Sequence, residues 1–253
     1  MERICHYTSF STLKLIIENK TIRLNSLKNV DDCQEAYTKD FGDQSAYFFA
    51  SCWTYDSNEN LPLWSMYVKD RFAVRLEIDV NFLEFEINNK NQITNHTSRN
   101  AFCYPMFRDG GKHVPISKID YRDDPYISVC ENLLGFISKD YIKSFGIIKK
   151  KIWDFQKECR FLLQATPVKY AKYRKNVSYF INHLESIDNN RETEIEYIDV
   201  YYDMNKLCNA NFMLGPSTNQ EDYIELKDYI YKNIPNFIGE IERSDAYTRD
   251  VSR

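Results

Sequence analysis

Short stretches with the pattern of β-strands recur along the whole chain, and only a few helical stretches separate them. The clearest is residues 72–78, where apolar and polar residues alternate as in a half-buried strand. Further strands are predicted at residues 4–7, 21–24, 47–53, 159–164, 195–202 and 212–214. This order predicts an α+β fold with a mixed or antiparallel β-sheet flanked by helices. Because the sequence contains neither an internal repeat nor a long linker, we expect a single domain over residues 1–253.

Three segments have the spacing of amphipathic helices. After Ser9 or Ser11, either of which can cap a helix, apolar residues recur at helical intervals through residue 17. The longest helix is predicted from Pro125 to Ile148, because proline suits the first helical position and apolar residues follow three or four apart. A last helix is expected over residues 219–234, and a short helix or bend over residues 61–64. Residues 25–35 are predicted to be a surface loop, and residues 88–123 largely irregular structure with one strand.

The composition restricts the class of protein. Hydrophobic residues make up 43% of the chain, enough for a sizeable core, while the seven glycines are too few for a glycine-rich phosphate loop to be expected. The net charge of −4 lacks the positive excess that is typical of dedicated nucleic-acid binders. The seven cysteines include no C-x-x-C pair, which favours reduced thiols over a disulfide framework or a zinc site. No stretch approaches the ~20 apolar residues of a membrane span, so we expect a cytoplasmic protein with no membrane partner.

Polar residues suited to a binding or catalytic site occur in three separate places. Residues 6–8, with the sequence His-Tyr-Thr, lie on the first predicted strand. Residues 61–67 follow the aromatic strand of residues 47–53 and end in Tyr67. Glu158 and Arg160 flank Cys159 on a late predicted strand. We predict that residues 6–8 belong to an active-site cleft that the other two groups complete.

Several short motifs follow one another in a specific order. They are Cys5-His6-Tyr7-Thr8, residues 13–19, Thr21-Ile22-Arg23-Leu24-Asn25-Ser26, residues 31–35, residues 61–67, residues 153–163 with their Glu-Cys-Arg core, and Leu214-Gly215-Pro216. This ordered set resembles the 2971 family of prokaryotic domains of unknown function. The resemblance covers most of the chain, and residues 88–123 and the segment after Thr166 are less typical. It implies a prokaryotic or phage origin and a role in antiviral defence or as a toxin, but no particular activity.

His6 on the first strand, Tyr67 in the middle and Glu158 at the start of a late strand are similar in order to the active-site residues of ADP-ribosyltransferases of the His-Tyr-Glu type. This similarity implies an ADP-ribosyltransferase-like fold with a split β-sheet, and NAD as the substrate. Cleavage of the nicotinamide–ribose bond builds positive charge on the sugar, which a carboxylate stabilises. The similarity implies that Glu158 is this carboxylate, that Tyr67 stacks on nicotinamide and that His6 orients the adenosine ribose.

The same similarity implies which residues contact NAD. Thr8 would act with His6 on the ribose, and Ser51 would support Glu158 from the neighbouring strand. Tyr67 lies in a Trp-Ser-Met-Tyr segment rather than in the usual strand–helix context, so another ring can take its place. A guanidinium suits the pyrophosphate oxygens. The expected cofactor-binding residues are therefore Tyr7, Thr8, Ser51, Trp64, Arg75 and Arg160, and no metal is expected.

Each of these residues also has a simpler explanation. His6 can be a strand histidine that is hydrogen-bonded within the fold. Glu158 and Arg160 lie two apart on a strand, share a face and can simply pair. Trp64 and Tyr67, three apart, can form a core contact of one helical turn.

Two charged segments and one rival function stay open. The acidic residues Asp31, Asp32 and Glu35 suit a hard cation, but a solvated loop is favoured. The interleaved Lys and Tyr of residues 169–175 suit single-stranded nucleic acid, but a solvated surface is favoured. The leading hypothesis is an ADP-ribosyltransferase or NAD hydrolase with a protein or nucleic-acid target and a regulatory or antitoxin partner. The rival is a non-enzymatic sensor or protein-interaction module.

Overall fold

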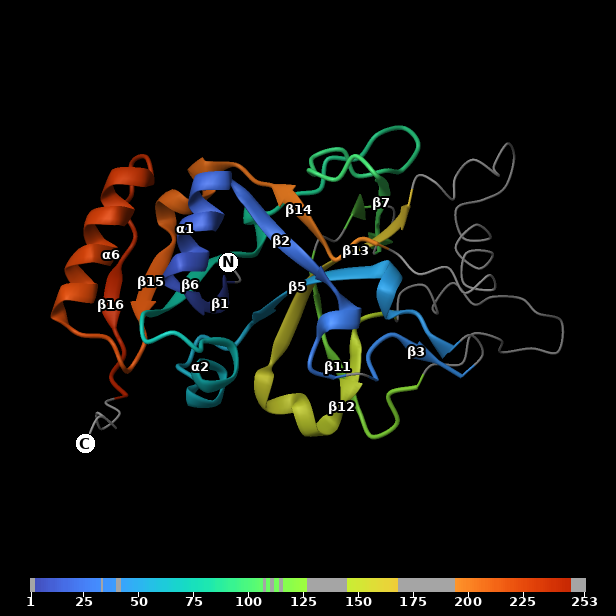
Figure 1. Cartoon of the computed structure of the whole chain (residues 1–253), viewed down its shortest axis with the longest axis horizontal. Coiled ribbons are helices and arrows are strands. Elements are labelled where there is room, and N and C mark those ends of the chain that lie inside the picture. The colour runs from blue at the N-terminus through green and yellow to red at the C-terminus, as the bar shows by residue number, and fades with distance from the viewer. Residues whose placement is uncertain are drawn as a thin grey trace, which may run out of the picture.

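The computed structural model describes residues 3–32, 34–39, 42–106, 108–109, 112–113, 116–126, 145–167 and 194–246, which form one mixed α+β fold (Figure 1). The main sheet contains β1 (Arg3–Ser9), β2 (Thr21–Ser26), β5 (Phe48–Thr54), β6 (Ala73–Asp79), β7 (Ala101–Pro105), β10 (Ile116–Lys118), β13 (Glu158–Pro167), β14 (Tyr197–Tyr201), β15 (Asn211–Leu214) and β16 (Ile241–Arg243). Its strand order is β10-β13-β5-β1-β6-β15-β16, with β2 and β14 attached through β5, and β7 attached through β13. The sheet is mixed because β15 and β16 are parallel while the other pairs are antiparallel.

In the part of the chain that the structure describes, few helices accompany this sheet. The α-helices are α1 (Phe10–Asn19), α2 (Leu61–Tyr67) and α6 (Gln220–Asn233), and the short 3₁₀ helices are η1 (Leu27–Asn29), η2 (Ser45–Tyr47), η3 (Val80–Phe82), η4 (Lys151–Gln156) and η5 (Met204–Asn209). Small two-stranded sheets pair β3 (Tyr37–Thr38) with β4 (Gly42–Asp43), β8 (Arg108–Asp109) with β9 (Lys112–His113), and β11 (Asp120–Arg122) with β12 (Ile148–Lys150). In the described residues no helix is long and apolar enough to cross a membrane.

Helix α1 connects the first two strands and covers the sheet beside α6 (Figure 1). Ser9 caps it, because the Ser9 hydroxyl accepts a hydrogen bond from the Thr12 amide at 3.1 Å. The apolar residues at helical spacing, Phe10, Leu13, Ile16 and Ile17, are all buried in the main core with residues of β6 and α6. The local pattern of cap and apolar stripe therefore determines both where α1 begins and which face it buries.

The sheet splits beside β5. Strand β1 pairs with β6 over seven positions but meets β5 only at Cys5, which lies opposite Thr54. Strand β2 meets β5 further along, where Asn25 lies opposite Ala50. In the described structure, residues 51–53 of β5 thus have no strand partner on this edge. Because α1 joins β1 to β2 and the two strands diverge, a gap opens between them along β5.

Most of the predicted elements are confirmed. An observed strand overlaps each predicted strand, and α1, α2 and α6 occupy the predicted helical segments. The half-buried pattern expected for residues 72–78 is wrong, since Arg75 is only 4% exposed and both faces of β6 are covered.

Three expectations about the remaining segments do not hold or lie outside the described residues. Residues 25–35 are not a plain loop, because Asn25 and Ser26 extend β2 and η1 follows. Residues 88–123 contain β7, β8, β9, β10 and β11 instead of one strand, since β7 and β10 gain hydrogen-bond partners from the distant strand β13. Most of the helix predicted to end at Ile148 lies outside the described residues, and Ile148 itself begins β12.

Candidate active site

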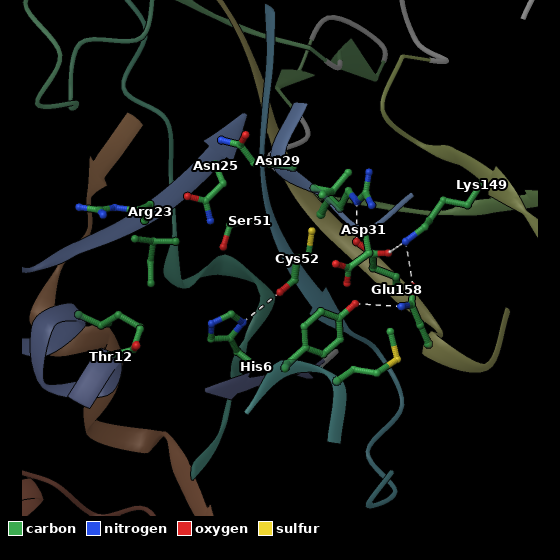
Figure 2. Close-up of a pocket in the computed structure, with 18 residues that line it drawn as sticks. His6, Thr12, Arg23, Asn25, Asn29, Asp31, Ser51, Cys52, Lys149 and Glu158 are labelled. Carbon is green, nitrogen blue, oxygen red and sulfur yellow. Dashed lines mark hydrogen bonds and ion pairs between the residues drawn. The ribbon is translucent and has the colours of Figure 1, made fainter. Parts of the chain in front are cut away.

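A cavity of about 590 Å³ occupies the gap between β1 and β2. Its walls come from β1, α1, β2, β5, α2, β12, η4 and β13, so segments from the first and the second half of the chain meet there. Figure 2 shows His6 and Thr12 on one side of the cavity and Lys149 and Glu158 on the other. The volume falls within the range of about 300–1,000 Å³ that is usual for small-molecule sites.

Five of the predicted site residues line this cavity, namely His6, Ser51, Tyr67, Glu158 and Arg160. His6 comes from β1, Ser51 from β5, Tyr67 from the end of α2, and the other two from β13. The two on β13 share a face because side chains two apart on a strand point the same way. The cavity therefore brings together the three segments that the sequence singled out.

The other four predicted NAD contacts, Tyr7, Thr8, Trp64 and Arg75, do not line the cavity. Tyr7 follows His6 on β1 and so points to the opposite face, where it lies across from Arg75 on β6. The Trp64 ring packs edge-on against Tyr7 at 4.7 Å between ring centroids. Thr8 is buried where β1 pairs with β6. Strand alternation thus turns Tyr7 and Arg75 away from the cavity, whereas Thr8 shares the face of His6 but lies further along β1, and Trp64 packs on Tyr7 from α2.

Four buried charged residues are linked on one side of the cavity, and three of them, Lys149, Glu158 and Arg160, line it. Glu158 accepts a hydrogen bond from Arg160 Nε at 2.5 Å and another from Lys149 Nζ at 2.9 Å. Both terminal nitrogens of Arg160 donate to the Glu35 carboxylate, and Lys149 Nζ lies 3.0 Å from Glu35 Oε1. All four residues are at most 4% exposed. The cluster of two carboxylates and two cations is neutral overall, which is how buried charges are tolerated.

These contacts keep Glu158 ionised. Burial alone would raise its pKa, but Arg160 and Lys149 outweigh that effect and hold the pKa of Glu158 at about 2. Burial would lower the pKa of Lys149, and the Glu158 and Glu35 carboxylates raise it instead. Burial together with the Glu158 charge raises the pKa of the Cys52 thiol, so it stays protonated. At neutral pH this side of the cavity therefore offers an ionised carboxylate, and neither a general acid at Glu158 nor a thiolate nucleophile at Cys52.

His6 forms the opposite side of the cavity and stays neutral, because its burial lowers the pKa of the imidazole more than its hydrogen bond raises it. Its Nδ1 lies 3.0 Å from the Cys52 carbonyl oxygen, in the part of β5 that has no strand partner on this edge (Figure 2). Since a carbonyl can only accept, Nδ1 carries the proton and Nε2 has a free lone pair. The ring also packs against Trp53 at 4.8 Å. His6 thus satisfies a backbone group of the split sheet and also presents an acceptor to the cavity.

Several residues of this site escape sequence reasoning. Lys149 falls at the end of the predicted long helix, and Gln156 has no motif of its own. Glu35 was considered only with the acidic loop, yet it is buried against Arg160, which lies 125 positions away. One signal was available: Glu158 and Arg160 alternate with Cys159, Phe161 and Leu163 on an apolar strand, and charged side chains in such a strand need buried partners. Within the described residues, no group of acidic, His or Cys side chains could hold a metal ion.

No family model, no curated protein and no solved structure matches this chain. The Lys- and Tyr-rich segment of residues 169–175, considered above for nucleic-acid binding, lies outside the described residues. The geometry and charge of the cavity are therefore the observations from which a function can be argued.

Proposed function

We propose that the cavity binds NAD and that the protein is an ADP-ribosyltransferase-like enzyme. It would cleave the nicotinamide–ribose bond and transfer ADP-ribose to a macromolecule or to water. The observation that carries this proposal is the convergence of His6, Tyr67 and Glu158 on one cavity of about 590 Å³. The split between β1 and β5 also agrees with the split sheet that the similarity to such enzymes implies.

Glu158 suits the carboxylate role in this reaction. Loss of nicotinamide leaves oxocarbenium-like positive charge on the ribose, and a carboxylate that is already ionised and fixed can stabilise that charge without reorganising. Arg160 and Lys149 each hold one of its two oxygens. Because each carboxylate oxygen has two lone pairs, Glu158 can still accept a hydrogen bond from a ribose hydroxyl.

His6 and Tyr67 suit the binding roles. The free Nε2 lone pair of His6 can accept from a hydroxyl of the adenosine ribose, with Thr12 and Ser51 on the cavity in place of Thr8. Tyr67 lines the cavity and is 42% exposed, so its ring can stack on nicotinamide. Arg160 cannot serve the pyrophosphate as expected, because Glu158, Glu35 and the Gly146 carbonyl already bind its guanidinium.

The proposal is tested by incubating the protein with NAD and measuring nicotinamide release and label transfer to protein and nucleic-acid acceptors. Glu158→Gln should lower the rate by about 10²–10³-fold, the usual effect of removing one preorganised electrostatic contact. Glu240→Gln, the same change at an exposed glutamate, is the matched control and should keep the parent rate. Equal rates in all three proteins would remove Glu158 from the mechanism.

The rival function, a non-enzymatic sensor or interaction module, also has one observation in its favour. The four buried charges neutralise one another, and such a cluster can stabilise a fold without taking part in turnover. Saturable NAD binding without nicotinamide release would favour a sensor, and neither binding nor release would favour an interaction module. A place in antiviral defence or as a toxin, with a regulatory or antitoxin partner, stays a prediction.

A further inference from the structure

The hydroxyl group of Tyr67 takes part in a chain of hydrogen bonds that leads to the buried charges. Gln156 Nε2 lies 2.9 Å from Tyr67 Oη, and Gln156 Oε1 lies 2.9 Å from Lys149 Nζ. A lysine ammonium has only donors, so Gln156 must turn its oxygen toward Lys149 and its NH₂ group toward Tyr67. The Tyr67 oxygen is therefore the acceptor in its bond with Gln156.

This orientation leaves the proton of the Tyr67 hydroxyl unused. In the described part of the chain, the bond from Gln156 is the one hydrogen bond that Tyr67 Oη makes. Burial, and next the charge of Glu158, raise the pKa of Tyr67, so the hydroxyl keeps its proton. We propose that the Tyr67 hydroxyl donates a hydrogen bond to the ligand in the cavity, and that Gln156 and Lys149 are the positioning residues that orient it.

This chain of hydrogen bonds also defines which hydrogen-bonding groups the ligand must carry. Lys149 Nζ binds both Gln156 and Glu158 at 2.9 Å, so one ammonium positions the Tyr67 donor and the Glu158 acceptor. A ligand needs an acceptor opposite Tyr67 and a donor opposite Glu158. Neighbouring hydroxyls of a ribose fit, because each hydroxyl both donates and accepts. The identity of this ligand rests on the proposed function, whereas the direction of the Tyr67–Gln156 bond does not.

A purely structural role for Gln156 makes a different prediction. Asn60 Nδ2 donates to the Phe155 carbonyl at 3.0 Å and already ties the start of α2 to η4. If Gln156 only strengthens this connection, exchanging donor and acceptor in its hydrogen bond with Tyr67 should leave ligand binding unchanged. If Gln156 orients the Tyr67 hydroxyl, the reversal should weaken binding as much as removing the hydroxyl does.

Gln156→Glu makes this reversal with almost no change of shape. One oxygen still faces Lys149, while the NH₂ group becomes an acceptor, so the Tyr67 proton turns toward it and away from the cavity. The Raman doublet of tyrosine distinguishes a donating from an accepting hydroxyl, and the difference between the parent and Tyr67→Phe isolates Tyr67. We expect the accepting form in the parent and the donating form in Gln156→Glu. Gln220→Glu, the same change at the exposed start of α6, should match the parent.

Calorimetric binding of NAD and of ADP-ribose completes the test. Gln156→Glu and Tyr67→Phe should each bind both ligands about tenfold more weakly than the parent, which is typical of one lost hydrogen bond. A donating Tyr67 in the parent would overturn the inference, whether or not NAD binds. An accepting Tyr67 in a protein that does not bind NAD would support the assigned orientation while refuting the proposed function. If Tyr67 donates in Gln156→Glu but this variant binds NAD and ADP-ribose as tightly as the parent, the proposed hydrogen bond from Tyr67 to the ligand is wrong.

Discussion

Two arginines lie buried in the same sheet, one on each face, and their surroundings differ. Arg160, on the cavity face, donates to Glu158, to both oxygens of Glu35 and to the Gly146 carbonyl. Arg75, on the opposite face, donates to the Ser57 carbonyl at 3.0 Å, while its nearest carboxylate oxygen, on Glu77, is 3.7 Å away. The Nε group of Arg75 has no hydrogen-bond partner in the described structure.

The difference shows where the chain concentrates its fully paired charges. On the cavity face, two carboxylates and two cations from three segments satisfy one another, and Gln156 extends the network to Tyr67. Such a network holds side chains in fixed positions, which a binding or catalytic site requires. On the opposite face, Arg75 meets the carboxylates of Glu77 and Glu242 only at 3.7 and 4.0 Å. Substitutions on the two faces should therefore differ in kind as well as in size.

The largest difference is expected between Arg160→Met and Arg75→Met, which remove one buried guanidinium from each face. Arg160→Met leaves Glu35 and Glu158 with only Lys149 as a cation, and should lower the free energy of unfolding by about 3–5 kcal/mol. Arg75→Met should lower it by about 1–2 kcal/mol, since fewer contacts are lost. Urea denaturation of both variants measures these values. Equal losses would show that the two faces do not differ in this way.

A smaller effect is expected from the pH dependence of stability. The pKa of Glu158 is about 2 in the folded protein, against 4.5 as its ordinary value. A lowered pKa contributes stability that is fully present above pH 4.5 and is lost as the pH falls toward 2. The shift corresponds to about 3 kcal/mol. Denaturation curves of the parent between pH 7 and 2 should show this loss, and those of Glu158→Gln should lack it. If the free energies of unfolding of the parent and of Glu158→Gln fall in parallel over this pH range, the assigned charge state of Glu158 is wrong.

The smallest effect is expected from Tyr7→Phe, which removes a hydroxyl on the face away from the cavity. The Asn60 amide donates to Tyr7 Oη at 3.1 Å, so the substitution should lower the free energy of unfolding by about 1 kcal/mol. NAD affinity should stay at the parent value, in contrast to the tenfold loss expected for Tyr67→Phe. Denaturation and calorimetry on the two variants check both statements. A loss of affinity in Tyr7→Phe would mean that this face also contacts the ligand.

Features that depend on neighbouring residues are predicted well from the sequence. Strands β1, β5 and β13 follow from apolar runs, and α1 from the Ser9 cap and its apolar stripe. Glu158 and Arg160 are predicted to share a face because they lie two apart on a strand. These predictions succeed because backbone periodicity and capping act over a few residues.

Contacts between distant residues are decided by the tertiary structure alone. The sequence by itself determined that His6, Tyr67 and Glu158 are placed on ordered elements, because strand and helix patterns are local. It did not determine that Glu35 and Lys149 meet Arg160 and Glu158, since those pairings need β5 and β13 to be assembled first. Nor did it decide that His6 and not Tyr7 faces the cavity, because that depends on the face of the sheet on which α1 and β2 enclose the cavity.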